Sequence, residues 1–251
     1  MRESQGAARG TGFHAAGAHC ERLRQKSKHN LPMEPFKPTK LTRLRRLPQR
    51  GHYDRETVYA ILDAGFVCHV GYEIAGQPYV TPTAYWREGD ALYWHGSAAS
   101  QMVRALEAGA PCCVTVSHLD ALVMARSGFH HSVNFRSVMA FGRAHKVDDP
   151  AAKLAALDAF IERMYPGRNA ELRRPSAKEL RVTTVLALPL DEAVAKVRTG
   201  HPVDDQPDYA LPVWAGLIPV EMKFGKPIDD PLLAPGITPA AALRRYRPAR
   251  G

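Results

Sequence analysis

The sequence lacks the features that mark membrane-spanning, disulfide-bonded and zinc-binding proteins. No stretch approaches the roughly 18 consecutive apolar residues that a membrane helix needs. The four cysteines form no CxxC pair, and adjacent Cys112 and Cys113 would point to opposite faces of a strand. We therefore expect no metal site, no membrane contact and a cytoplasmic protein whose thiols are small buried side chains.

The short motifs of several large enzyme classes are also missing. The chain contains no GxGxxG, GxxxxGK[ST], HExxH or GxSxG. Adjacent His130 and His131 would diverge on an extended chain, and no carboxylate lies at ligand spacing, which argues against a metal centre there. Nothing in the sequence points to a Ser/His/Asp hydrolase.

Basic charge is abundant only at the N-terminal end. The net charge of the 251 residues is +9, and residues 1–51 hold 12 Lys and Arg against 3 Asp and Glu. The other 200 residues hold 22 of each sign, which argues against nucleic-acid binding by the body of the protein. We expect a disordered leader over residues 1–51, with a transit peptide or a start at Met33 as alternatives. A nucleic-acid or acidic partner for this leader stays open.

Turn residues and alternating apolar residues predict a mainly β chain with short helices. Asp54 can cap a helix that runs through residues 57–64, and Ser97 or Ser100 can begin another through 102–106. A third helix is expected from Pro150. Strands are expected at 66–72, 79–86, 91–95, 112–117, 121–126, 137–147, 181–190, 193–198 and 213–220. The pattern predicts one α+β domain over residues 52–222, followed by a proline-rich irregular tail over 223–251, and favours a closed antiparallel barrel.

One candidate binding segment joins the end of a strand to the start of a helix. His95 ends the strand, Gly96 permits close approach of the backbone, and Ser97 and Ser100 supply hydroxyls. A phosphate would find donor groups there, on the favourable end of a helix dipole. The alternative is an ordinary helix start with a serine cap.

The second candidate segment supplies an arginine. Arg136 and Ser137 enter an apolar strand, so a guanidinium fork and a hydroxyl could both meet a phosphate. The alternative is a solvated arginine on a strand edge. Trp214, in an apolar strand near the C-terminus, would by default pack in the core.

The order of these segments resembles the pyridoxamine 5′-phosphate oxidase-like family of FMN-binding split barrels. The resemblance lies in 76–82, 92–96, 134–138 and 141–144, and runs from about His52 to Pro219. The branch that it is most similar to is the flavin-nucleotide-binding group with the nitroimidazole-resistance proteins. It implies a six-stranded antiparallel split β-barrel and a homodimer, with FMN in clefts at the dimer interface.

The resemblance also implies roles for particular residues. The strand that includes Thr81 and Thr83 would lie beside the isoalloxazine. His95, Ser97 and Ser100 would lie at the phosphate and ribityl end, with Arg136 and Ser137 completing the phosphate site. Trp214 would approach from the partner subunit. The C-terminal Arg-Leu-His-Asp-Arg type signature of true pyridoxamine phosphate oxidases is absent, which argues against vitamin B6 oxidation.

Two functions follow as hypotheses from the residues and the resemblance together. The first is an FMN-dependent oxidoreductase that carries electrons between NAD(P)H and a small acceptor, with no side chain assigned as acid or base. The second is a non-catalytic module that holds FMN or haem, for which His130 and His131 are the reason to consider haem.

Overall fold

The computed structural model describes residues 33–244 and residue 246. The chain divides into units 1–34 and 35–251, and the description below concerns the second unit. The first 32 residues of the predicted leader lie outside the described residues. Its last part, by contrast, is packed: the Phe36 side chain is 3% exposed, and its backbone N–H donates to the Tyr53 carbonyl at 2.8 Å.

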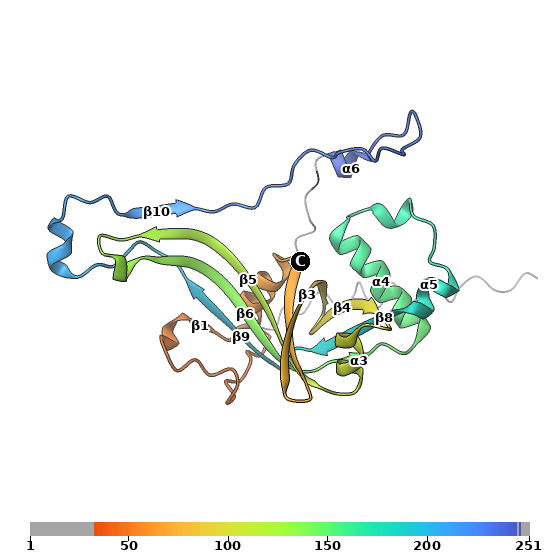
Figure 1. The fold of residues 1–251 in the computed structure, drawn as a ribbon, viewed down its shortest axis with the longest axis horizontal. Coiled ribbons are helices and arrows are strands. Elements are labelled where there is room, and N and C mark those ends of the chain that lie inside the picture. Colours follow the sequence, from red (N-terminus) through yellow and green to blue (C-terminus); the bar gives the residue numbers. More distant parts are fainter. Residues whose placement is uncertain (1–32, 245, 247–251) are drawn as a thin grey trace, which may run out of the picture. The chain divides into compact units, whose positions relative to one another are not determined.

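The described regular elements are ten strands and a set of short and longer helices (Figure 1). The strands are β1 Gly51–His52, β2 Val67–Ile74, β3 Gln77–Glu88, β4 Ala91–Ser97, β5 Pro111–Met124, β6 Ser132–Arg143, β7 His145–Lys146, β8 Thr183–Pro189, β9 Glu192–Arg198 and β10 Gly216–Pro219. The α-helices are α2 Arg55–Asp63, α3 Gln101–Glu107, α4 Pro150–Met164, α5 Ala177–Val182 and α6 Ala241–Arg244. The 3-10 turns are η2 Pro48–Arg50, η3 Gly128–His130, η4 Arg168–Ala170 and η5 Gln206–Ala210.

The strands form one antiparallel sheet in the order β1-β9-β6-β5-β2-β3-β4-β8-β7, with β10 added against β5. The predicted α+β split barrel is confirmed. The expectation of a closed barrel is wrong, because the end strands β1 and β7 do not pair with each other in the described part of the chain. The sheet curls instead: β8 and β9 lie far apart in the order, yet only two residues join them. A Cβ on Gly142 of β6 would lie 2.8 Å from Leu188 Cδ1 of β8, so these strands meet through side chains.

The main core lies inside this curled sheet, under α2 and α3. Asp54 caps α2 through a 2.7 Å hydrogen bond from the Thr57 N–H, as the sequence predicts. Val58, Ile61 and Leu62 of α2 are fully buried against the strands. Burial raises the pKa of the Cys68 thiol to about 12, so this core cysteine stays protonated.

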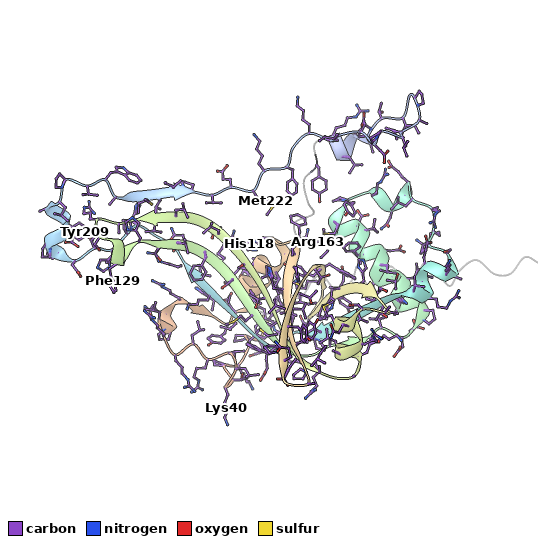
Figure 2. The ribbon with its side chains drawn as sticks, viewed as in Figure 1. Lys40, His118, Phe129, Arg163, Tyr209 and Met222 are labelled. Atoms are coloured by element: carbon purple, nitrogen blue, oxygen red, sulfur yellow. The ribbon has the colours of Figure 1, made fainter. Side chains whose placement is uncertain are left out.

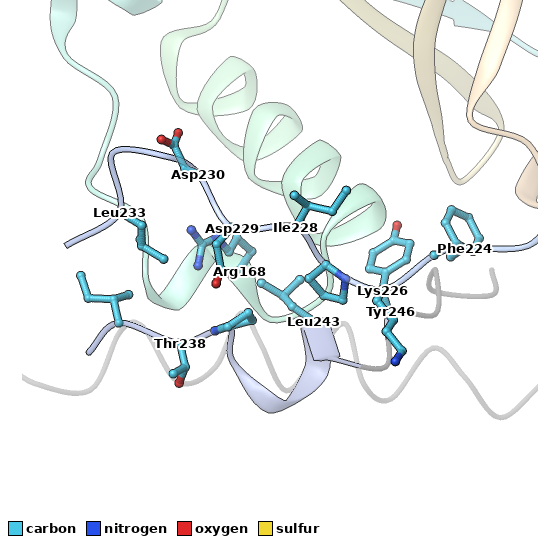
Figure 3. Close-up of a pocket in the computed structure, with 14 residues that line it drawn as sticks. Arg168, Phe224, Lys226, Ile228, Asp229, Asp230, Leu233, Thr238, Leu243 and Tyr246 are labelled. Carbon is cyan, nitrogen blue, oxygen red and sulfur yellow. The ribbon is translucent and has the colours of Figure 1, made fainter. Parts of the chain in front are cut away.

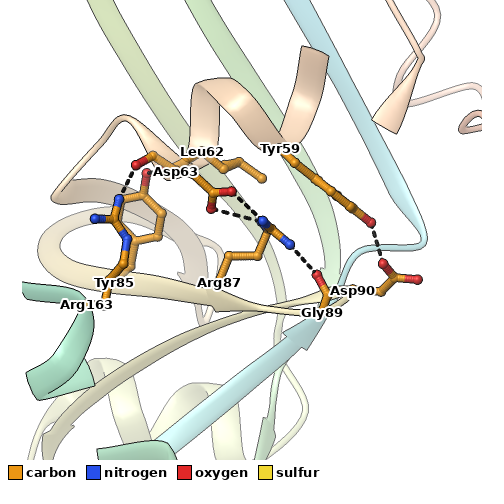
Figure 4. A network of polar contacts seen from close by, with 8 residues as sticks. All are labelled: Tyr59, Leu62, Asp63, Tyr85, Arg87, Gly89, Asp90 and Arg163. Carbon is orange, nitrogen blue, oxygen red and sulfur yellow. Dashed lines mark hydrogen bonds and ion pairs between the residues drawn. The ribbon is translucent and has the colours of Figure 1, made fainter. Parts of the chain in front are cut away.

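A polar network fixes α2 and α4 to the β3–β4 hairpin (Figure 4). Arg87 of β3 donates from both Nε and Nη2 to the Asp63 carboxylate, with an Nε–Oδ1 distance of 2.9 Å. Its Nη1 donates to the Gly89 carbonyl at 2.7 Å. Arg163 of α4 donates to the Asp63 carbonyl. A largely buried ion pair of this kind holds its elements in one arrangement because either charge alone would be costly to bury. Helix α4 is thereby held over the face of β3 and β4 opposite the core.

Strands β5 and β6 extend as a long two-stranded arm, with β10 beside β5 (Figure 1). The sequence suggested two strands at 112–117 and 121–126. The structure has one strand, and its register shifts between Leu119 and Ala121, because one extra residue is accommodated as a bulge. Near the far end the Asp204 side chain, fully buried, binds Arg126: Oδ1 accepts from its N–H at 2.9 Å and Oδ2 from Nη1 at 3.0 Å.

Two further features complete the described chain. Among the described residues after 223, α6 is the one regular element. Across the described part of the chain, no helix is both long and apolar enough to cross a membrane.

Candidate functional site

The sheet separates between β3 and β4. The two strands pair from the hairpin end, Glu88↔Ala91, to Tyr85↔Trp94 and then diverge. Beyond that point, residues 77–84 of β3 pair only with β2, and residues 95–97 of β4 pair only with β8. Each strand therefore turns an unpaired backbone edge toward the split, and such edges offer donors and acceptors to a ligand.

The sequence-predicted residues Thr81, Thr83, His95 and Ser97 all lie along this split. Thr81 and Thr83 belong to the β3 edge, and the Thr81 Oγ1 lies 3.2 Å from the Tyr72 hydroxyl. His95 and Ser97 belong to the β4 edge. The structure thus brings together residues from two of the predicted segments.

His95 is a partly buried polar residue on the β4 edge. Its ring meets Phe160 of α4 edge to face, with centroids 4.7 Å apart, and lies 6.1 Å from the Trp86 ring. Its Nδ1 atom is buried and has no hydrogen-bond partner. Desolvation lowers the pKa of His95, so the imidazole is neutral near pH 7, with one nitrogen able to donate and one able to accept.

Ser97 and Ser100 follow His95 at the turn into α3. Ser97 Oγ accepts from the Ala99 N–H at 3.2 Å, whereas Ser100, although it is the N-cap, makes no side-chain cap bond. The Ser100 hydroxyl is therefore available to a ligand. Arg104, which the sequence reasoning missed, donates from Nη2 to the Ala99 carbonyl at 2.9 Å and so brings a positive charge to this turn. Its position four residues after Ser100 on a helix was the available signal.

Arg136 and Ser137 lie elsewhere on the sheet. Three strands, β5, β2 and β3, stand between β6 and β4. The Arg136 guanidinium is bound to the Asp120 carboxylate, and Ser137 Oγ donates to the Lys196 carbonyl at 3.3 Å. Within one chain the structure does not bring Arg136 and Ser137 to Ser97 and Ser100, so their shared phosphate site stays a prediction.

Trp214 is not a core residue, which was its default interpretation. Its side chain is 66% exposed, and its ring covers Gly216, where a Cβ would lie 2.8 Å from the indole. It precedes β10 on the arm. Whether it approaches a ligand of another subunit stays a prediction.

Two rows of side chains on the outer face of the sheet beside the split contain no Asp, Glu, Lys or Arg. Side chains there alternate with buried ones such as Cys68 and Val70. One row crosses four strands through paired residues, and a second row runs beside it. The rows are Pro82–His69–Thr115–Met139 and Val80–Gly71–Cys113–Phe141. Val80 is 67% exposed and neighbouring Val67 is 52% exposed, an unusual surface for an isolated protein.

The histidine pair lies at the end of the arm, near the exposed Phe129 (Figure 2). His130 Nε2 lies 3.3 Å from Asp205 Oδ2, and His131 Nδ1 lies 2.8 Å from the Ser127 carbonyl oxygen. A histidine that donates Nδ1–H to a carbonyl leaves the Nε2 lone pair free. Among the residues that the structure describes, no cluster of three or more His, Cys, Asp or Glu could hold a metal ion.

Three of the hollows on the described surface are large enough for a small molecule. One, of about 420 Å³, lies within the tail, where Ile228, Leu233 and Leu243 surround Arg168 (Figure 3). A second, of about 410 Å³, opens beside Phe141 and Glu192. The third, of about 430 Å³, lies between β4, α4 and α5 and reaches His95. Only the third includes a residue predicted from the sequence.

Comparison with known proteins agrees with this geometry. The family model described as Pyridoxamine 5′-phosphate oxidase matches residues 54–197. The structure of the flavocytochrome Anf3 from Azotobacter vinelandii is 45% identical, with a TM-score of 0.81, and covers 86% of this chain and 100% of its own. An FAD and haem binding protein from Mycobacterium smegmatis is 37% identical, with a TM-score of 0.75, covering 78% of this chain and 96% of its own.

A more distant structure supports the branch expected from the sequence. A putative 5-nitroimidazole antibiotic resistance protein from Bacteroides thetaiotaomicron is 26% identical, with a TM-score of 0.50, and covers 59% of this chain and 86% of its own. No curated protein matches. The matched region contains the split and most of the sheet that forms it, and this chain belongs to the pyridoxamine 5′-phosphate oxidase family of split barrels.

Proposed function

We propose that this protein binds a flavin at the split between β3 and β4. The observation that carries the proposal is the 45% identity to a flavocytochrome along that protein's whole length. The split supports it from within the chain, because it has two unpaired strand edges, and the β4 edge and the turn after it carry a buried imidazole nitrogen without a partner and a serine hydroxyl without a cap bond. Polar groups of this kind need a partner, and a ligand can supply it.

The residues present fit the two chemically different ends of a flavin mononucleotide. The Ser97 and Ser100 hydroxyls, with Arg104 beside them, would hold a phosphate. The β3 edge with Thr81 and Thr83 would face the polar rim of the isoalloxazine, and His95 Nδ1 would offer it one hydrogen bond. FMN needs only these groups, and FAD would need a further site for its adenosine half.

The proposed activity is oxidation and reduction of a small acceptor with electrons from NAD(P)H. A bound flavin supplies the hydride and electron chemistry, and the protein supplies position and electrostatics. In this chain α4 covers His95 and keeps water from it, while the neutral imidazole can hold a proton at one nitrogen only. The two outer rows contain no carboxylate, ammonium or guanidinium group that would compete for the ring.

The substrate of this activity is proposed to be something other than pyridoxamine phosphate. Strand β10, which follows Trp214, pairs with β5 through its backbone, and its residues Gly216–Pro219 carry no cationic side chain. A substrate phosphate would find no guanidinium there. Family membership alone does not transfer an activity, because related sites on one fold perform different reactions.

The proposed assembly is a homodimer in the cytoplasm. The outer face, with Val80 and Val67 exposed, is suited to contact a second copy of itself. Such a contact would place residues of the partner subunit over the split. Cys68 and Cys112 are free thiols, which suits a reducing compartment.

The activity is tested by mixing the flavin-loaded protein with NADPH or NADH under anaerobic conditions and following the flavin absorbance. Bleaching, followed by recovery of colour on adding a nitroaromatic or quinone acceptor, is the expected result. Flavin that binds but is not bleached by either nucleotide would leave the protein as a binding module. Protein with the same fold that binds no flavin would refute the proposal.

A second candidate function is haem binding at the end of the arm. The specific observation is His131, whose Nδ1 lies 2.8 Å from the Ser127 carbonyl and whose Nε2 is left for a ligand, near an exposed Phe129. The two most identical structures cited above are named for a flavocytochrome and for FAD and haem binding. A Soret band that the wild-type protein shows and His131→Ala loses, with flavin binding intact, would support it. An unchanged Soret band would remove His131 as the ligand.

A further inference from the structure

The hollow between β4, α4 and α5, here called the α4–α5 pocket, has the form of a binding site. Its volume is about 430 Å³, enough for a purine or a substituted benzene ring. Phe160 and Ile161 of α4 and Leu172 of the following loop form its apolar wall. His95 and Thr183, which belong to neighbouring strands β4 and β8, close its inner side.

Two arginines stand at the mouth of the α4–α5 pocket. Arg173 lies 2.5 Å from Glu179, and Arg174 lies 3.0 Å from Asp158. Both arginine side chains are more than 60% exposed, at 73% and 63%. Asp158 and Glu179 also line the pocket. Ion pairs between exposed side chains are weak, so an incoming anion can compete with each carboxylate for its arginine.

The pocket therefore combines two kinds of recognition in one place. An aromatic edge and aliphatic side chains favour a flat, apolar ring. Guanidinium groups bind carboxylates and phosphates through paired hydrogen bonds and also stack on aromatic rings.

We propose that the α4–α5 pocket binds a planar aromatic group that carries an anionic substituent, with Arg173 and Arg174 holding the anion. Two sources have this chemistry. One is the adenosine phosphate half of FAD, which rests on the proposed flavin function because His95 and the Ser97–Thr183 pair lie between the split and the pocket. The other is a separate small molecule such as an aromatic carboxylate.

The test uses the full-length protein and calorimetric titrations with FMN, FAD, AMP and benzoate. A double variant, Arg173→Gln with Arg174→Gln, removes both cations while leaving the pocket wall intact. Arg168→Gln is the matched control, since Arg168 makes an exposed ion pair with Glu171 and does not line the pocket. AMP and benzoate are titrated into flavin-free and FMN-loaded protein.

The two sources give different results. If FAD binds at least about tenfold more tightly than FMN, and the double variant alone abolishes that preference, the ring is the adenine of FAD. If FAD and FMN bind alike while AMP or benzoate binds FMN-loaded protein and the double variant weakens it about tenfold, the ring belongs to a separate molecule.

The remaining results overturn the proposal. The proposal fails if neither AMP nor benzoate binds and FAD binds no more tightly than FMN. It also fails if the double variant keeps the wild-type preference for FAD, or the wild-type affinity for AMP or benzoate. Failure of the flavin function is seen separately, because FMN binding to the wild-type protein reports on the split alone. AMP and benzoate titrated into flavin-free protein would still decide whether the pocket binds its ligand.

Discussion

The guanidinium of Arg136 on β6 lies flat against the carboxylate of Asp120 on β5. Nη2 is 2.8 Å from Oδ1, and Nε is 3.0 Å from Oδ2. Asp120 occupies the point where the register of β5 shifts, and its carbonyl accepts from the Val220 N–H at 2.9 Å. The hydrogen bonds to Asp120 raise the pKa of Arg136 further. The pair thus connects β5 to β6 at the bulge, where the arm extends beyond the rest of the sheet.

Removing either partner of this pair should weaken the arm. We expect Arg136→Ala and Asp120→Asn each to lower the free energy of unfolding by about 1 kcal/mol, because the pair is partly exposed. Flavin affinity should change little, and thermal unfolding with a parallel FMN titration measures both quantities. A loss of FMN affinity in Arg136→Ala that Asp120→Asn does not share would restore the phosphate-binding role expected from the sequence.

Ser100→Ala isolates one proposed ligand contact. The Ser100 side chain makes no cap bond, so its loss should leave the stability of the flavin-free protein unchanged. Affinity for FMN should fall by about 1 kcal/mol, the contribution of one hydrogen bond. Ser132→Ala, at an exposed serine on the arm, is the control and should leave the affinity at the wild-type value. Equal affinities for all three proteins would place the phosphate away from α3.

A charge on the outer face should disrupt the proposed dimer. Val80 is 67% exposed at the β3 end of one outer row, so Val80→Lys would bury an unpaired ammonium in a self-associated face. Light scattering should give twice 27.7 kDa for the wild-type protein and about 27.7 kDa for the variant. Ile228→Lys, at a tail residue that is 96% exposed, should stay dimeric. A dimeric Val80→Lys would exclude this face.

Burial of His95 should make stability depend on pH. Its pKa is lowered in the folded protein from an ordinary value of 6.5, so the unfolded chain takes up a proton more readily. The contribution of His95 is fully present above that ordinary value and is lost as the pH falls below it. Between about pH 7.5 and about pH 5.5 the melting temperature should fall less steeply in His95→Gln than in wild type.

The comparison is one of slopes, because His95→Gln also changes the packing against Phe160. His145→Gln, a change at an exposed histidine of β7, serves as the control and should keep the wild-type slope. If His95→Gln also keeps the wild-type slope, the imidazole is not held neutral by burial.

Local patterns in the sequence were enough to predict α2 and most of the strands. Asp54 caps α2 as expected, because capping depends on residues next to each other in the chain. Residues 95–97 and 81–83 were both identified as parts of a binding site, and the order of the segments placed them in the right family. Both segments lie along the split between β3 and β4, and the split itself could not be predicted because it depends on which strands pair.

Other features could not be predicted because they depend on contacts distant in the sequence. The Arg136–Asp120 pair requires the bulge in β5, which alternation alone does not reveal. The apolar segment around Trp214 predicts a core residue, yet the Trp214 side chain is 66% exposed. The α4–α5 pocket combines two strands, two helices and a loop, and its arginines have no motif of their own.

The visible absorption spectrum of the purified protein, after reconstitution with flavin and removal of the unbound excess, tests the central claim most directly. The proposed site predicts flavin bands that stay with the protein in about one equivalent per chain, and lose intensity in a protein that combines Ser100→Ala with His95→Gln. A folded protein that remains colourless after reconstitution with either FMN or FAD would contradict the account.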